Sequence, residues 1–158
     1  MKFPELETLA KGLEKEAHLV VWQGVDRLEV VALGGEIFED AFPLPLYVQS
    51  AAAEAGMILD TTTAARLEIE KMPEDFWEGL EETKYGERLR VSVLGRAGRK
   101  YLEVYHAVSH GEGRPSGMLD ELALTEEELF KVARWMRERA LFDHRSGDVI
   151  MKILARLS

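Results

Sequence analysis

The chain of 158 residues has no cysteine and no asparagine, and it contains only two glutamines, Gln23 and Gln49. The absence of cysteine excludes a disulfide framework, a zinc–thiolate site and a cysteine nucleophile. Amides and thiols are the side chains that degrade when hot, and heat-adapted proteins replace them with charged residues. The composition therefore predicts a protein of a thermophile, and it points to no particular chemistry.

Long apolar runs are also missing. No run approaches the roughly 18 residues of a membrane-spanning helix, and the first residues lack the apolar stretch of a signal peptide. With 29 acidic and 20 basic side chains, the net charge of −9 argues against binding nucleic acid or an anionic membrane, because both would repel the chain. These features predict a cytoplasmic protein, and the length predicts one globular domain over residues 1–158.

Apolar spacing predicts helices over residues 4–17, 46–55, 125–140 and 146–157, with a short acidic helix over 74–80. Pro4 suits the first turn of its helix, and Gly56 suits the end of the next. Thr125 and Glu128 form a capping box, in which each side chain satisfies a backbone amide near the helix start. Ser146 is expected to cap the last helix.

Alternating apolar residues predict two hairpins. The first joins residues 19–22 to 28–32 through the turn at 24–26. The second joins 88–93 to 101–108 through a turn at residues 97–98. Directly opposed residues share a face of a sheet, so this register pairs Val91 with Val104 and Leu89 with His106. It places His106 on the apolar face.

Residues 61–72 alternate less clearly, and we expect a strand there. The result is an α+β fold: an antiparallel sheet of about five strands, made of two hairpins plus one strand, with helices packed mainly on one face. Apart from the helices after Pro73 and Ser146, this order of elements is similar to that of roadblock domains, which are small dimeric modules that dock on GTPases and scaffolds. The similarity lies in element order alone, and such an analogy carries no function by itself.

The loop over residues 110–120 is the candidate site if the protein is an enzyme, namely a small hydrolase or transferase. It carries His110, Arg114, Ser116 and Asp120. Arg114 could clamp a carboxylate or phosphate, and Asp120 could orient His110. The loop lacks the Lys-Ser/Thr ending of a phosphate-binding loop and the Gly-x-Ser-x-Gly pattern of a serine nucleophile, so a flexible turn is the simpler interpretation.

The second hairpin tip carries Arg96, Arg99 and Lys100. A solvated turn whose charges protect a sheet edge is the simpler interpretation, and a docking point for an acidic protein partner is the functional one. No metal site is expected, because His106 and His110, four residues apart on a strand, would lie about 13 Å apart. No cofactor motif is found either.

Two features suggest a homodimer: the small residues of 51–55 and the apolar face of the last helix. The sequence thus favours a non-enzymatic, homodimeric protein-interaction module, with the enzyme of the 110–120 loop as the alternative. Packing inside one chain could use both surfaces.

Overall fold

The computed structural model describes residues 3–23, 28–33, 44–110 and 121–157, apart from the side chains of residues 70 and 110. The chain divides into two compact units, unit 1 (Met1–Gly95) and unit 2 (Arg96–Ser158). The single domain over residues 1–158 stays a prediction. The expected loop at 110–120 lies mostly outside the described residues, because only its first residue, at the end of a helix, is described.

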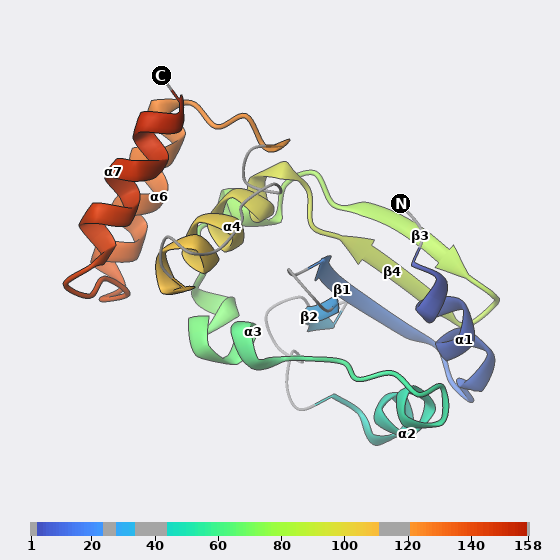
Figure 1. Cartoon of the computed structure of the whole chain (residues 1–158). Coiled ribbons are helices and arrows are strands. Elements are labelled where there is room, and N and C mark those ends of the chain that lie inside the picture. Colours follow the sequence, from blue (N-terminus) through green and yellow to red (C-terminus); the bar gives the residue numbers. More distant parts are fainter. Residues whose placement is uncertain (1–2, 24–27, 34–43, 111–120, 158) are drawn as a thin grey trace. The chain divides into compact units, whose positions relative to one another are not determined.

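Unit 1 contains a four-stranded mixed sheet in the order β2-β1-β4-β3 (Figure 1). The strands are β1 (Ala17–Gln23), β2 (Leu28–Leu33), β3 (Glu81–Tyr85) and β4 (Leu89–Val93). β1 pairs antiparallel with β2, as the first predicted hairpin requires, but parallel with β4. β3 and β4 form a second antiparallel hairpin. The α+β class is confirmed, whereas the sheet of the described residues is mixed and has one strand fewer than expected.

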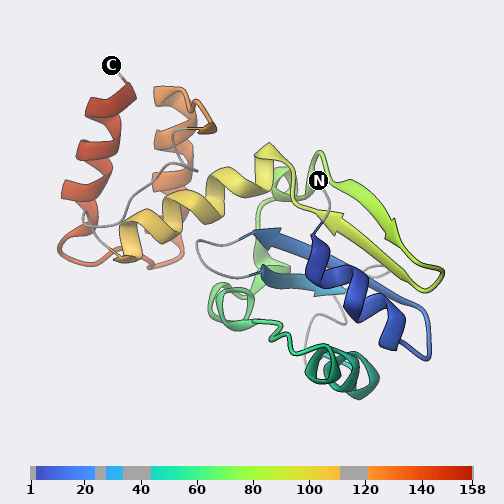
Figure 2. The ribbon, with the colours of Figure 1, turned by 45° about the vertical axis from the view of Figure 1, so that its right-hand side comes forward.

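Helices α1 (Pro4–Gly12) and α2 (Leu46–Glu54) lie side by side in unit 1 (Figure 2). Their buried residues, including Leu6, Leu9 and Val48, form one core with Leu19 and Val91 of the sheet. The small residues of α2 serve this packing, since a Cβ on Gly12 would lie 3.5 Å from that of Ala51. α1 is shorter than the predicted helix over 4–17, because residue 17 already begins β1.

The segment between α2 and the second hairpin corrects one expectation. Residues 61–72 contain the helix α3 (Thr62–Leu67) and the 3-10 turn η1 (Ile69–Lys71) in place of a strand. Thr63, Ala64 and Leu67 are buried, which is a helical spacing. The predicted acidic helix is the 3-10 turn η2 (Glu74–Trp77).

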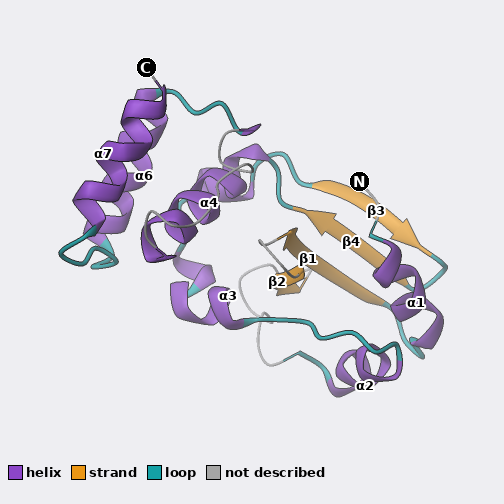
Figure 3. Ribbon diagram, viewed as in Figure 1, coloured by secondary structure: helices purple, strands orange, loops and turns teal. Residues whose placement is uncertain are grey.

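Unit 2 contains α4 (Arg96–His110), α6 (Glu126–Glu138) and α7 (Ser146–Leu157), which contact one another. The predicted strand over 101–108 is wrong, because these residues belong to α4 (Figure 3). The apolar residues of this segment fit both patterns. Leu102, Val104 and Val108 alternate along the sequence, whereas the buried Tyr101, Val104, Tyr105 and Val108 recur at intervals of three and four residues. The pairing of Leu89 with His106 and the roadblock-like order of elements therefore do not hold.

Two helix starts were predicted with different success. The capping box is confirmed: the amide of Glu128 donates to Thr125 Oγ1 at 3.1 Å, and the amide of Thr125 donates to Glu128 Oε1 at 3.1 Å. Ser146 is instead the first residue of α7. Its hydroxyl accepts from the amide of Asp143, and the Asp143 carboxylate accepts from the amide of Arg145.

Candidate functional site

A row of basic side chains crosses three strands of unit 1. His18 of β1 is the direct partner of Arg90 of β4, and Arg90 is the direct partner of Lys84 of β3. Directly paired residues project from the same face, and neighbouring strands lie about 4.8 Å apart. We call His18, Arg90 and Lys84 the cationic row.

The cationic row is not what sheet stability favours, because like charges that face each other across strands repel. Lys84 and Arg90 are both exposed. Glu82 offers Arg90 partial compensation, with 3.7 Å between Glu82 Oε1 and Arg90 Nη1. Lys84 forms no ion pair with any residue that the structure describes. The row therefore carries excess positive charge within an acidic protein.

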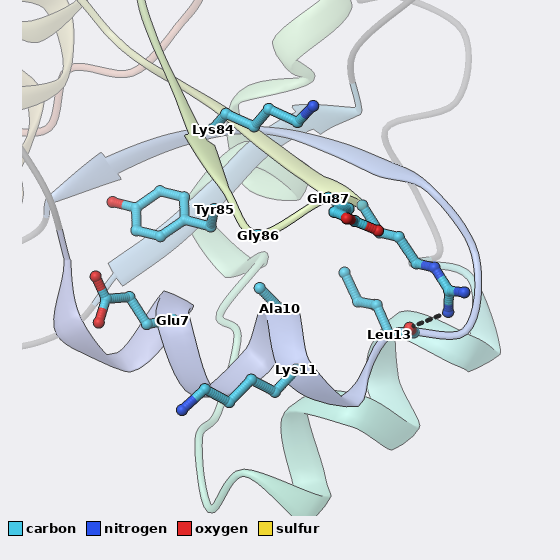
Figure 4. A pocket seen from close by; sticks show the side chains of 9 residues that line it. Glu7, Ala10, Lys11, Leu13, Lys84, Tyr85, Gly86 and Glu87 are labelled. Carbon is cyan, nitrogen blue, oxygen red and sulfur yellow. Dashed lines mark hydrogen bonds between the residues drawn. The ribbon is translucent and has the colours of Figure 1, made fainter.

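Two hollows adjoin the β3–β4 turn. Hollow 1, of about 420 Å³, lies between this turn and α1 and is lined by Tyr85, Ala10, Lys11 and Glu7 among others (Figure 4). Hollow 2, of about 430 Å³, is lined by the whole cationic row and by Glu16, Ala17, Glu87 and Arg88. Lys84, Glu87 and Arg88 line both hollows. Volumes of this size accommodate a small ligand or a few side chains of a partner.

Arg88 lines both hollows in a fixed orientation. Its Nη1 donates a hydrogen bond of 2.8 Å to the backbone carbonyl of Leu13, drawn as the dashed line in Figure 4. A guanidinium has five N–H donors in a planar fork, so one bond to the backbone orients the group while most donors stay available. A guanidinium held in this way loses little entropy when it binds a carboxylate or phosphate.

His18 forms the most chemically distinctive contact of the row. Its Nε2 lies 2.8 Å from the hydroxyl oxygen of Ser92, a buried residue of β4. Burial lowers the pKa of His18, and the charge of Arg90 lowers it further, against an opposing effect of Glu82. The buried Nδ1 has no hydrogen-bond partner among the described residues.

The His18–Ser92 pair resembles the nucleophile and base of a hydrolase only in part. A catalytic histidine needs a third group that orients its other nitrogen. In the described part of the chain, no carboxylate bonds to His18 Nδ1, and the Ser92 hydroxyl is too buried to attack a bound substrate. The pair therefore fixes the imidazole beside the row without forming a complete catalytic set.

The structure moves the predicted docking residues away from any hairpin. Arg96, Arg99 and Lys100 lie in the first turns of α4. Arg96 is held inside unit 2: its Nη1 and Nη2 lie 2.5 and 2.8 Å from the two carboxylate oxygens of Glu128, and its Nε donates to the carbonyl of Leu122 at 3.1 Å. Arg99 is half-buried, and Lys100 is buried. The docking hypothesis assumed that these residues form a hairpin tip. That assumption is wrong, because they begin a helix.

The other predicted site lies at the margin of what the structure describes. Arg114, Ser116 and Asp120 fall outside the described residues, and His110 ends α4 with its side chain outside them. The enzyme of the 110–120 loop stays a prediction. Within the described residues, no group of three His, Asp or Glu side chains could hold a metal ion. No helix in the same residues is long and apolar enough to cross a membrane.

Both surfaces that suggested a homodimer are used inside the chain. Ala51 and Ala52 belong to the core of unit 1, and Val149, Ile150 and Ile153 of α7 are buried. α7 contacts α4 and α6. Homodimerisation stays a prediction, and these two surfaces no longer argue for it. A monomer mass in light scattering at all accessible concentrations would contradict it.

Comparison with known proteins identifies no family for this chain. No protein-family model matches the sequence, and neither the curated proteins nor the solved structures contain a match. The site must therefore be judged on its own geometry. The sequence predicted one part of this site, because the alternation of Leu89 and Val91 with Arg90 places Arg90 on the solvent-facing side of a strand. The other part was missed, because the charged residues 81–85 do not look like a strand.

Proposed function

We propose that the protein is a non-enzymatic interaction module, and that unit 1 binds an acidic segment of a partner protein at the end of the sheet around the β3–β4 turn. The observation that carries this proposal is the cationic row, in which Lys84 and Arg90 face each other next to His18. The repulsion within the row opposes folding, and an acidic ligand would relieve it.

The electrostatics of the whole chain also bear on the partner. The net charge of −9 repels acidic partners at long range. At physiological ionic strength, however, charges more than about 8 Å apart are largely screened. The contact is then decided by the groups at the site. Lys84, Arg88 and Arg90 line hollow 2 with Glu16 and Glu87. Glu82 pairs with Arg90, and Lys84 has no ion pair with any described residue. The prealigned Arg88 offers carboxylates a bidentate partner.

The absence of a complete catalytic set in the described residues favours binding over catalysis. His18 and Ser92 lack an orienting carboxylate. A ligand that is bound and released unchanged requires only the charges and the two hollows.

The proposal is tested with a fluorescein-labelled oligoglutamate peptide and fluorescence anisotropy. Arg90→Glu should weaken binding at least about tenfold, which corresponds to about 1.4 kcal/mol. Arg134→Glu is the matched control, because this exposed residue of α6 makes the same charge change in unit 2. Added salt should weaken the binding of both the wild type and the control. Equal losses in the two variants, or no binding of the peptide by the wild type, would refute the proposal.

A further inference from the structure

Hollow 2 brings basic groups from three strands around one small volume. Lys84 comes from β3, Arg90 from β4 and His18 from β1, and Arg88 precedes β4. Arg88 is the last residue of the turn that leads into β4, and both it and Arg90 line the hollow. The Arg88 guanidinium is anchored to Leu13, which limits how far this group can withdraw from the hollow.

We infer that hollow 2 is an oxyanion-binding site, in which Lys84, Arg88 and Arg90 contact the anion and the adjacent His18 takes up a proton when the anion binds. This inference rests on the proposed function, because the oxyanion would be a carboxylate of the docked acidic segment. A tetrahedral oxyanion in solution shares the same chemistry. Guanidinium groups bind both kinds of oxyanion in a bidentate manner.

The proton uptake follows from the charges around His18. Arg90, Arg88 and Lys84 line the hollow with it and disfavour a positive imidazole, whereas Glu82, Glu16 and Glu87 favour one. Burial and Arg90 together leave the pKa of His18 below its ordinary value of 6.5. A bound anion offsets the field of Arg90, so the pKa of His18 should rise on binding.

Ser92 can accommodate the proton. When His18 is neutral, the hydroxyl either donates to Nε2 or accepts from it, depending on the tautomer. When the imidazole is protonated, Nε2 donates and the Ser92 hydroxyl rotates to accept. Protonation is unfavourable at the other ring nitrogen, because the N–H of Nδ1 would be buried without an acceptor among the described residues. The anion must offset this cost, and for this reason the uptake depends on the ligand.

Linkage fixes the sign of the pH effect. If the anion raises the pKa of His18, the protonated protein must bind the anion more tightly by the same factor. Affinity should therefore rise as the pH falls through the titration range of His18. Coupling between two sites is typically about 5- to 150-fold in affinity, and we expect an effect near the lower end.

The experiment follows the imidazole proton signals by NMR in sulfate and in chloride at equal ionic strength. Sulfate is the probe, because it stays doubly charged throughout the titration of a histidine. The pKa of His18 should be higher in sulfate than in chloride, and sulfate should bind about fivefold more tightly at about pH 5.5 than at about pH 7.5. The signal of His144, which is exposed in unit 2, is the internal reference.

Variants separate the site from general charge effects. Arg90→Gln should abolish the response of His18 to sulfate, Arg90→Lys should restore most of it, and the matched control Arg134→Gln should keep all of it. An unchanged titration of His18 in sulfate, or equal losses in Arg90→Gln and Arg134→Gln, would overturn the inference.

If oligoglutamate binds but leaves His18 unaffected, the docking proposal stands and this inference falls. If sulfate acts on His18 but oligoglutamate does not bind, the docking proposal falls, and hollow 2 is a site for an oxyanion in solution and not for a docked carboxylate.

Discussion

The two units differ sharply in charge. Residues 1–95 contain 19 acidic and nine basic side chains, a net charge of −10, whereas residues 96–158 contain ten acidic and 11 basic ones, a net charge of +1. Unit 2 uses charge to hold its fold, since Arg96 binds both oxygens of Glu128 and the carbonyl of Leu122. Unit 1 has the excess of acids, yet it assembles basic side chains in a row where they repel one another.

This difference shows that charge contributes to the two units for different reasons. An ion pair that also completes a capping box stabilises a helix start, and it needs no ligand to explain it. A like-charged row beside two hollows has no such structural explanation. Overall composition is therefore a poor guide to local charge, because the cationic row lies in the more acidic unit.

The largest expected effect concerns a backbone contact of unit 1. A Cβ on Gly95 would collide with the carbonyl oxygen of Gly79 and would lie 2.8 Å from that of Glu78. Neither backbone oxygen can move without shifting η2 relative to the end of β4. Gly95→Ala should lower the free energy of unfolding by about 3 kcal/mol, measured by urea denaturation.

Gly147→Ala is the matched control in unit 2, because a Cβ there meets nothing within 4 Å. This substitution in α7 should be neutral or should stabilise the protein by about 0.5 kcal/mol. Trp22 lies in unit 1 and Trp135 in unit 2, so variants that keep one of them report on each unit separately. Similar losses for the two glycine variants would show that the contact with Gly79 is not the cause.

The next effect concerns the ion pair of unit 2. The hydrogen bond from Arg96 is the main reason that the pKa of Glu128 is lowered from 4.5 to about 2. Glu128→Gln keeps the capping box but loses the charge. It should lower the free energy of unfolding by about 1 kcal/mol at neutral pH.

The pH dependence of this loss has a definite sign. A carboxyl whose folded pKa is depressed contributes stability above its ordinary pKa and loses it as the pH falls. The difference between the wild type and Glu128→Gln should therefore shrink between pH 4.5 and about pH 2. Glu126→Gln in the same helix turn is the control, and it should show a smaller loss. A pH-independent difference would rule out the ion pair as its origin.

A third comparison concerns the ends of two helices. After α2, Gly56 has a positive φ of 71°, whereas after α6 the corresponding conformation is taken by Ala140 with a φ of 56°. Gly56→Ala should cost about 1 kcal/mol and Ala140→Gly should gain about 0.5–1 kcal/mol, because glycine adopts this conformation without a steric penalty. Thermal denaturation of the two variants measures both effects. Changes of the same sign would contradict this account.

The smallest effect is the acid sensitivity of unit 1 through His18. Because the pKa of His18 is lowered in the folded state, the unfolded chain binds more protons once the pH falls below 6.5. The wild type should lose stability in this range, and His18→Gln should lose less. His144→Gln, at an exposed position of unit 2, is the control for the loss of an imidazole elsewhere in the chain. The stability of the three proteins in chloride between pH 7 and pH 5 checks this.

Local sequence patterns correctly predicted the features that depend on contacts between residues close together in the chain. The capping box of Thr125 and Glu128, the helix that ends before Gly56 and the first hairpin were all predicted from residues a few positions apart. The α+β class followed from them. The expectations of a thermophilic source and of a homodimer remain predictions.

Predictions failed where one pattern fits two structures. Residues 101–108 satisfy both an alternation and a helical spacing, and only the packing of α4 against α6 and α7 selects the helix. Because residues 101–108 are helical, Arg96 and Arg99 do not lie in a hairpin turn. The hairpin of β3 and β4 was not predicted, because β3 is short and charged. The turn of the second hairpin thus lies about ten residues earlier in the chain than predicted.

The sequence by itself determined the composition, the charge of each unit, the capping of α6 and the alternation that places Arg90 opposite the apolar face of β4. Only the tertiary structure decided that β1 lies parallel to β4, which brings His18 next to Arg90 across 72 residues of chain, and that β3 adds Lys84 to the same row. Strand alternation is local, whereas strand pairing depends on the packing of distant segments. The individual side chains of the candidate site are thus encoded locally, and their assembly is not.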